Sequence, residues 1–478
     1  MKAFCLLIAL LIMILTCCAR ATPAPLSELP TPEPIRPTPT PAPEPPSPQP
    51  LIVTLRLWLP EELDPYSEAA GAHVLAQQLA DFTKTYPDLQ VEVVVKKTHG
   101  RGGLLDFLRT ASYAAPSVLP DLVVLDADEL EAAAGLGLLQ PLDHLPLNGM
   151  NERFPFAAEM GRAGESTYGF VLGVDMEHLA YRPVLLDSPP LSWTQPFSPP
   201  LHFIFPAGGN DQQVNDATLV QYLAAGGRLT DADNRPSLDQ KALLSVLSFY
   251  QDCVVAAAGP QTVTMVISPP LPPTATVTIT ATSDSGSEVI SPTQPVTVVV
   301  TVPPPVSIII SPTLVLSIHD ADQAWESFRR GVGDIAVVRA GRFWSEADGS
   351  VAAAPIPTRY GNPLSLVRRG WIIAVTTQDP ARKKLVLLLL NWLIAPEHNG
   401  RWTRAAGYLP GTRSALREWD ISDRERTILR KIMDTAVPAP PETIISVVGP
   451  AVQEAVEDVL LGHSSPEEAA AKAVQRLR

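Results

Sequence analysis

The sequence predicts an α/β fold, and three observations carry this prediction. Strand-like and helix-like segments alternate from Leu51 onward. Residues 120–125, Pro-Asp-Leu-Val-Val-Leu, predict a strand that is apolar on both faces after Asp121, as in strands buried within parallel sheets. The long apolar run at 385–390 spans about half a membrane and is interrupted by Asn391, which indicates a buried core helix.

The elements follow in order along the chain. Residues 51–58 alternate near their end and predict a first strand, followed by a helix that ends before Pro87. Residues 91–95 predict a second strand, and residues 104–113 predict a helix after a glycine-rich turn. Two more helices have start signals, which are Ser237 with Gln240 as a capping box and Asp379-Pro380 as N-cap and first turn.

The N-terminus predicts export. Residues 1–17 have one basic residue, Lys2, and then an apolar run that suits a secretory signal peptide and is short for a spanning helix. Leu15-Thr16-Cys17-Cys18 resembles a lipobox, which makes Cys18 or Cys17 the expected lipidated residue and the lipid the expected membrane anchor. An uncleaved anchor helix is the alternative. Residues 18–50 are rich in proline and predict an extended stalk.

Composition excludes several classes of function. The net charge of −14, without basic runs, argues against nucleic-acid binding. Of the four cysteines only Cys253 lies in the body, so no disulfide framework is possible there. Metal-ligand spacings, phosphate loops and nucleophile elbows do not occur in the sequence, and we expect no metal, no cofactor and no catalysis.

A low-complexity segment rich in Pro, Thr and Val interrupts the body at 259–318, and Ile-Ser-Pro occurs three times within it. Long segments of this kind are uncommon within domains. A hairpin between 276–280 and 296–302 is one interpretation, because Val and Thr alternate there. The prolines favour the other interpretation, an exposed flexible loop.

Several short motifs follow one another along the body. They are Pro120-Asp121 before an apolar strand, Tyr168–Gly173 with Leu179–Arg182, Gly370-Trp371, Asp379-Pro380, Asn391-Trp392 and Ala406–Pro410. No single motif is specific, but their order resembles bacterial extracellular solute-binding proteins of the sugar-type family, which includes maltose-binding protein. The departures are the 259–318 insertion and Arg182, which follows Tyr181 where the family usually has Asn.

The resemblance implies a two-lobed fold of the type II periplasmic-binding-protein kind, with crossing hinge strands and a cleft between the lobes. Lobe one is expected at 51–168 and 357–395, and lobe two at 170–354 and 396–478. The crossings are expected at 168–173 and 354–357.

Candidate ligand-binding residues lie after predicted strands or in aromatic motifs. Carboxyl ends of parallel strands meet ligands, which nominates acceptors that take sugar hydroxyl protons. Capping of the helix near Glu129 is the equal alternative for Asp126 and Asp128. Aromatic rings cover the C–H faces of sugars. Asn215 and Asp216 are further candidates, although helix capping is the simpler interpretation. The full prediction is Trp58, Glu61, Asp126, Asp128, Trp344, Trp371 and Tyr408.

The sequence therefore predicts a monomeric lipoprotein at the cell surface or in the periplasm. It is expected to capture a sugar or oligosaccharide and deliver it to the permease subunits of an ABC importer. One alternative is a surface sensing or binding lipoprotein without a transporter, since the insertion would obstruct docking on a permease. Another is a cell-surface glycan hydrolase that uses carboxylates such as Glu61 and Asp128.

Overall fold

The computed structural model describes residues 52–209, 213–257, 261–267, 296–302 and 307–477. The predicted signal peptide, both candidate lipidation cysteines and the stalk lie outside these ranges. Residues 51–478 form one compact unit. Its main sheet has ten strands, eight of them in the order β10-β7-β11-β6-β13-β3-β1-β2, while β12 pairs with β6 and β14 pairs with β13.

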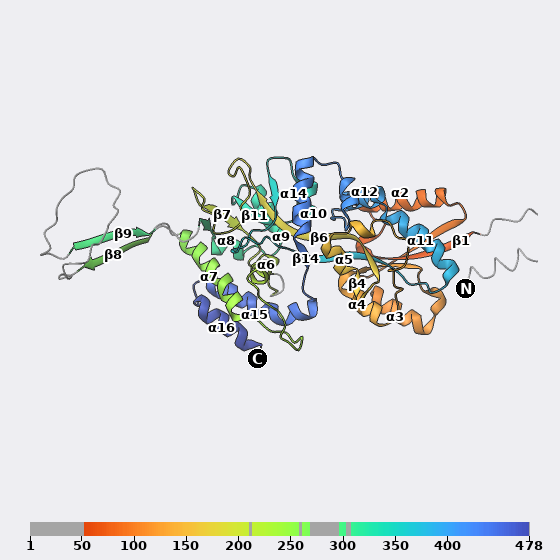
Figure 1. Ribbon diagram of the computed structural model, residues 1–478, viewed down its shortest axis with the longest axis horizontal. Coiled ribbons are helices and arrows are strands. Elements are labelled where there is room, and N and C mark those ends of the chain that lie inside the picture. The colour runs from red at the N-terminus through yellow and green to blue at the C-terminus, as the bar shows by residue number, and fades with distance from the viewer. Residues whose placement is uncertain (1–51, 210–212, 258–260, 268–295, 303–306, 478) are drawn as a thin grey trace, which may run out of the picture. The chain divides into compact units, whose positions relative to one another are not determined.

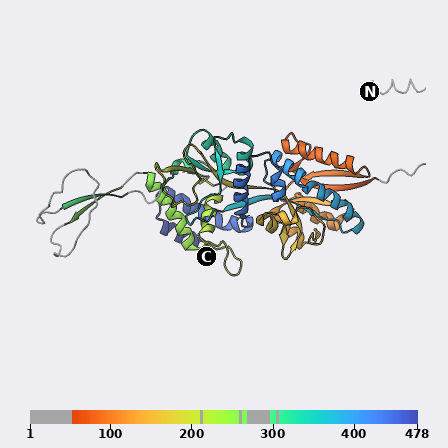
Figure 2. The ribbon, with the colours of Figure 1, turned by 45° about the horizontal axis from the view of Figure 1, so that its top comes forward.

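The first lobe is built on parallel strands, as predicted. β1 pairs in parallel with β2 and β3, and α2 and α3 pack against these strands. Helix α12 packs on α2, and both views place these two helices side by side (Figures 1 and 2). The elements of this lobe are β1 (Val53–Pro60), β2 (Leu89–Lys96), β3 (Leu122–Asp126), α2 (Ala70–Thr85), α3 (Leu104–Ala114), α4 (Ala127–Gly135), α5 (Pro155–Met160), the hairpin of β4 (Arg162–Ala163) and β5 (Ser166–Thr167), α11 (Pro380–Ile394) and α12 (Pro396–Ala406).

The second lobe has its own helices and a mixed part of the sheet. Strand β11 is parallel to β7 and antiparallel to β6, and α7 packs against α15 and α16. The elements are β7 (Leu201–Ile204), β10 (Ile308–Ile309), β11 (Ile335–Arg339), β12 (Ala352–Ala354), α6 (Asp216–Ala224), α7 (Gln240–Ala257), α8 (Pro312–Leu316), α9 (Ala321–Arg329), α10 (Ala340–Glu346), α15 (Glu442–Leu460) and α16 (Pro466–Arg476).

Two long strands pass from one lobe to the other. β6 (Gly169–Tyr181) pairs with β13 (Ser365–Val375) in its first part and with β11 and β12 in its last part. β13 pairs with β3 at one end and with β14 (Ala436–Pro438) at the other. The chain between α12 and β14 forms α13 (Arg413–Arg417) and α14 (Asp423–Asp434).

The crossings lie later in the chain than the sequence led us to expect. Residues 352–354 pair with the second-lobe part of β6, and Thr358 bridges to Ser192, so 354–357 is not a crossing. The change of partners falls near Asp175 on β6 and near Arg368 on β13. Helix α12 belongs to the first lobe, because it packs on α2, whereas we expected the second lobe from residue 396.

Two local expectations also need correction. Helix α7 is capped by Asp239, whose carboxylate accepts from the Ala242 amide at 2.9 Å, and not by Ser237. Within the expected insertion, β8 (Gln261–Ile267) pairs with β9 (Val296–Val302), and residues 276–280 lie outside the described ranges. Residues 308–316 form β10 and α8 of the second lobe, so the insertion is shorter than 259–318.

Candidate functional site

The candidate site is built on the middle of the two crossing strands. Successive side chains of a strand point to opposite faces, so Asp175 and Glu177 lie on the same face of β6. The register of β13 against β6 shifts between Val367 and Arg369. Such an irregularity changes the direction of a side chain. It allows two consecutive arginines, Arg368 and Arg369, to line the same cavity.

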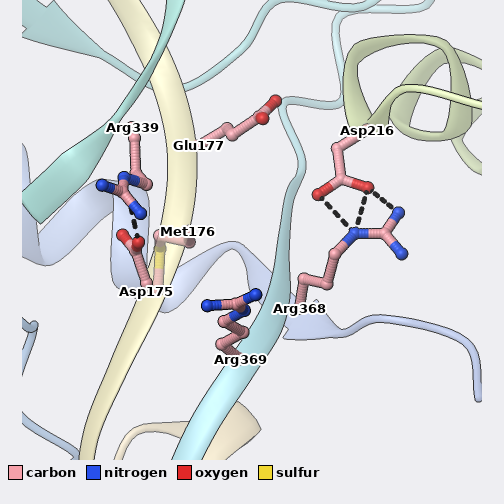
Figure 3. A pocket seen from close by; sticks show the side chains of 7 residues that line it. All are labelled: Asp175, Met176, Glu177, Asp216, Arg339, Arg368 and Arg369. Carbon is pink, nitrogen blue, oxygen red and sulfur yellow. Dashed lines mark hydrogen bonds and ion pairs between the residues drawn. The ribbon is translucent and has the colours of Figure 1, made fainter. Parts of the chain in front are cut away.

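This first cavity has a volume of about 120 Å³. The crossing strands β6 and β13 and the second lobe contribute to it, since Asp216 begins α6 and Arg339 ends β11 in the second lobe. Figure 3 shows the side chains that surround it, which are Asp175, Met176, Glu177, Asp216, Arg339, Arg368 and Arg369.

Two ion pairs hold part of this lining. The Arg368 Nε lies 2.9 Å and 3.1 Å from the two carboxylate oxygens of Asp216, and its Nη2 also contacts Asp216 (Figure 3). Arg339 lies 3.4 Å from Asp175 and 2.8 Å from Asp322. Burial raises the pKa of Asp175 to about 6, against the opposing effect of Arg339.

Two other groups in the same cavity lack such partners among the described residues. One carboxyl oxygen of Glu177, Oε2, is buried without a hydrogen bond. Burial, followed by the nearby charge of Asp216, raises the pKa of Glu177 well above its ordinary value. Arg369 is exposed, and Figure 3 shows its side chain between Asp175 and Arg368 with no interaction to either.

A second cavity, of about 250 Å³, shares Asp175 and Arg339 with the first. It reaches the first lobe through Tyr408, which follows α12, and the second lobe through Arg342 on α10. The remaining lining is Gly341, Ser345, Ala406 and Gly407. The two cavities together form a polar site that both lobes and both crossing strands line.

Tyr408 is the one predicted ligand-binding residue found in the lining of either cavity, and it lines the second. It belongs to an aromatic cluster, with ring centroids 6.3 Å from Trp371 and 5.8 Å from Trp402. Gly173 of β6 makes this arrangement possible, because a Cβ there would lie 3.0 Å from the Tyr408 Cβ. Trp371 itself is buried.

The other two predicted tryptophans are packed in the interior. Trp58 is 4% exposed, with the Lys96 ammonium 4.7 Å from its ring centroid. Trp344 is 6% exposed and packs against Phe343 and His178. Within the described ranges, the indole nitrogens of both tryptophans have no hydrogen-bond partner. Ligand contact by Trp58, Trp344 and Trp371 stays a prediction.

The predicted carboxylates lie at the edge of the first lobe. Asp126 caps α4 by accepting from the Asp128 amide at 3.2 Å, which is the capping alternative. His99 lies 3.6 Å from Asp126 and 3.4 Å from Glu129. Burial raises the pKa of Asp126 and Asp128, and the positive charges of His99 and the hinge arginines act in the opposite direction.

Glu61 lies in a short 3-10 helix, Glu61–Leu63, directly after β1, and is exposed. Its neighbour Glu62, which we did not predict, contacts the hydroxyl of Thr98 and lines a small cavity beside Tyr408. Asn215 caps α6 through the Thr218 amide at 2.8 Å, whereas Asp216 reaches the first cavity.

The sequence analysis missed most of the hinge charges. One signal was available for Arg368 and Arg369, since two consecutive arginines interrupt an otherwise apolar strand. Asp175 and Glu177 gave a similar signal, since they are charged residues within the mostly apolar strand β6. Arg339 gave no comparable signal, because a charged residue at a strand end is common.

Neither a metal site nor a membrane span is found in the described part of the chain. No group of three or more His, Cys, Asp or Glu side chains among the described residues is arranged to hold a metal ion. No helix in the same ranges has the length and apolar character that crossing a membrane requires.

The fold defined by these lobes, crossing strands and cavities is that of the two-lobed solute-binding proteins. The sugar-binding protein MalE from Xanthomonas citri matches with a TM-score of 0.60 and 16% identity, over 89% of this chain and 96% of that one. The cyclic α-maltosyl-1,6-maltose binding protein from Arthrobacter globiformis matches with a TM-score of 0.58 and 15% identity, over 89% and 98%.

An ABC transporter solute-binding protein from Thermotoga lettingae, bound with α-D-tagatose, matches with a TM-score of 0.54 and 18% identity, over 89% of this chain and 98% of that one. No family model and no curated protein matches the sequence. The predicted two-lobed α/β fold is therefore confirmed.

Proposed function

We propose that this chain is a solute-binding protein that takes a saccharide into the two cavities at the crossing strands. The observation that carries the proposal is the combined lining of the two adjoining cavities. The second lobe supplies Arg339 and Asp216, the crossing strand supplies Asp175, and the first lobe supplies Tyr408. Carboxylates accept hydrogen bonds from sugar hydroxyls and guanidinium groups donate to them. An aromatic ring covers the C–H face of a sugar. Structural neighbours whose names state binding of maltose or tagatose support the choice of sugar.

The route of the sugar is part of the same proposal. Residues 1–17 direct export, Cys18 or Cys17 carries the lipid, and residues 18–50 form a stalk, so the protein stands as a monomer at the cell surface or in the periplasm. The sugar then passes to the permease subunits of an ABC importer. This role needs binding and release without a chemical step.

A thermal-shift screen against sugars, polyols and amino acids tests the proposal. A ligand that binds only the folded state stabilises it by about 2.7 kcal/mol at 100 times its Kd. We expect a clear rise in Tm with at least one saccharide and a smaller rise with amino acids. If amino acids give the larger shift, or no sugar gives any, the proposal is wrong.

A pair of tyrosine variants locates the binding. Tyr408→Ala removes a ring that lines the second cavity, whereas Tyr113→Ala removes one that is 81% exposed at the end of α3. The rise in Tm caused by the sugar, measured within each variant, should shrink for Tyr408→Ala and persist for Tyr113→Ala. Equal shifts in the two variants would place the sugar elsewhere.

A surface sensor without a transporter is the second candidate. The segment between α7 and β10, which includes the β8–β9 pair, favours it, because an inserted segment on the second lobe would obstruct docking on a permease. If the ligand-bound protein stimulates the ATPase activity of a reconstituted importer, the transport function is supported and the sensor function is excluded.

A further inference from the structure

The hinge cavity contains more hydrogen-bond donors than free acceptors. Its two ionised acceptors are already occupied, since Asp216 pairs with Arg368 and Asp175 pairs with Arg339. On the second-cavity side, Arg342 is held by Glu326 at 3.1 Å and by Glu346 at 2.9 Å. A ligand that enters finds these charges neutralised by the protein itself.

One guanidinium in the lining remains without a partner. Arg369 has no ion pair within 4.0 Å and no hydrogen bond to any described residue, and it lies on the crossing strand facing the cavity (Figure 3). Every other arginine in the two linings pairs with at least one carboxylate. The Arg369 guanidinium is therefore available to pair with a charged group of a ligand in this cavity.

The remaining carboxyl group of this cavity is Glu177, whose charged form is disfavoured by its surroundings. Its Oε2 is buried without a hydrogen bond to any described residue, and burial, followed by the charge of Asp216, raises its pKa well above its ordinary value. No ion pair joins Glu177 to Arg369 in the described part of the chain. The free donors of Arg369 match a group with several acceptor oxygens and a negative charge.

We propose that the cargo is an anionic saccharide whose carboxylate pairs with Arg369 in the hinge cavity. This inference rests on the proposed function and names its substrate class. Guanidinium and carboxylate form a planar, charge-assisted pair, and a single unpaired guanidinium matches a single carboxylate. The sugar hydroxyls of the same ligand are left to the other polar groups of the two linings.

The experiment compares matched sugars on the chain from residue 51 onward, which forms a compact unit by itself. Isothermal titration gives the Kd for glucose and glucuronate, galactose and galacturonate, and the oligosaccharides of each. We expect the acid of at least one pair to bind at least about tenfold more tightly than its neutral partner, as one charge-assisted pair provides. Raising the salt concentration should reduce this preference, because ionic attraction is screened.

Variants assign the preference to one side chain. Arg369→Gln should bring the ratio of the two Kd values close to one, and Arg369→Lys should restore part of it. Arg235→Gln, which removes an arginine with 76% side-chain exposure in the second lobe, should leave the ratio unchanged. Circular dichroism and Tm confirm that each variant is folded.

The outcomes separate this inference from the proposed function. If no sugar of either kind binds, the proposed function is wrong and the inference falls with it. If neutral sugars bind as tightly as their acids, or if Arg369→Gln keeps the preference, only the inference is overturned. Tighter binding of glucose 6-phosphate than of glucuronate would overturn the assignment to a carboxylate.

Discussion

The residues at the hinge show why the site carries so many charges in a partly buried place. An isolated buried charge is costly, and an ion pair in the same place requires good geometry to offset its desolvation. Arg368 meets this condition by contacting both oxygens of Asp216, which also begins α6. A protein that used this region only for packing would be better served by apolar residues.

His178, next to these charges on β6, predicts a pH effect on stability. It is fully buried, its Nδ1 lies 3.0 Å from the Leu179 carbonyl oxygen, and burial lowers its pKa from 6.5 to about 4. Between these two values the unfolded chain binds a proton that the folded protein does not. This residue therefore reduces the free energy of unfolding as the pH falls from 6.5 to 4, by about 3 kcal/mol in all.

Urea unfolding at several pH values checks this prediction. His178→Gln should lose stability at pH 7 but show a weaker decline from pH 6.5 to 4 than the wild type. His73→Gln, at an exposed position of α2, serves as the control and should decline as the wild type does. Asp175 acts in the opposite direction, since its raised pKa stabilises the protein as the pH falls below 6. A decline that His178→Gln leaves unchanged would contradict the assignment.

Among single residues, sequence reasoning recovered those whose role is local. Asp379 caps α11 as predicted, and Asp126 caps α4, which was one of the two roles left open for it, because an N-cap depends on a few neighbouring positions. Tyr408, chosen from its motif, lines the second cavity, and its contact with a ligand stays a prediction. The hinge ion pairs were missed because Arg368 and Asp216 are 152 positions apart, and only the fold brings them together.

At the scale of elements, the two lobes touch where α10 meets the end of α12. The Arg404 guanidinium on α12 donates to the Trp344 carbonyl on α10. The backbones of Gly341 and Gly407 meet so closely that a Cβ on Gly341 would overlap the Gly407 carbonyl oxygen. Two glycines thus permit this approach of one lobe to the other.

Gly341→Ala should weaken sugar binding by opposing this approach. A methyl group at this position forces α10 away from Gly407, which disfavours the arrangement in which both lobes line the second cavity. We expect the Kd to rise by about tenfold, within the usual range of conformational coupling.

Titration calorimetry measures the effect, and Gly135→Ala is its control. Gly135 ends α4, and a Cβ there would meet nothing within 4 Å. The Kd of the Gly135→Ala variant for the sugar should match that of the wild type. A normal Kd for Gly341→Ala would show that binding does not depend on this contact.

Most elements could be predicted from sequence, and their assignment to lobes could not. Strands β1, β2 and β3 and helices α2, α3 and α11 were expected close to where they occur, since each follows its own periodicity. Helix α12 was assigned to the wrong lobe, because its packing on α2 is a contact between segments more than 300 residues apart.

At the scale of the whole molecule, one sheet runs through both lobes, and the apolar core does the same. A single cluster of buried residues includes Trp58 of the first lobe and Trp325 and Phe343 of the second. The β8–β9 pair forms a sheet of its own among the described strands. The segment that contains it is therefore separable from the body.

Replacement of residues 258–306 by a short Gly/Ser linker should leave the body folded. The body brings the chain on either side of the segment close together, since the Ile310 amide donates to the Cys253 carbonyl of α7 at 3.3 Å. Loop length has a weak effect on stability. We expect Tm to change by a few degrees at most and sugar binding to persist. Unfolding of this variant in differential scanning calorimetry would show that the segment supports the body.

The register shift at Arg368 ties two properties of the protein together. The residues that select the ligand by charge belong to the strand that also joins the lobes, at the point where its hydrogen-bond ladder is irregular. A substitution at 368 or 369 then alters both the ligand preference of the cavity and the flexibility of the hinge between the lobes. In a lineage that exchanges one cargo for another, selectivity and the balance between open and closed forms would evolve jointly.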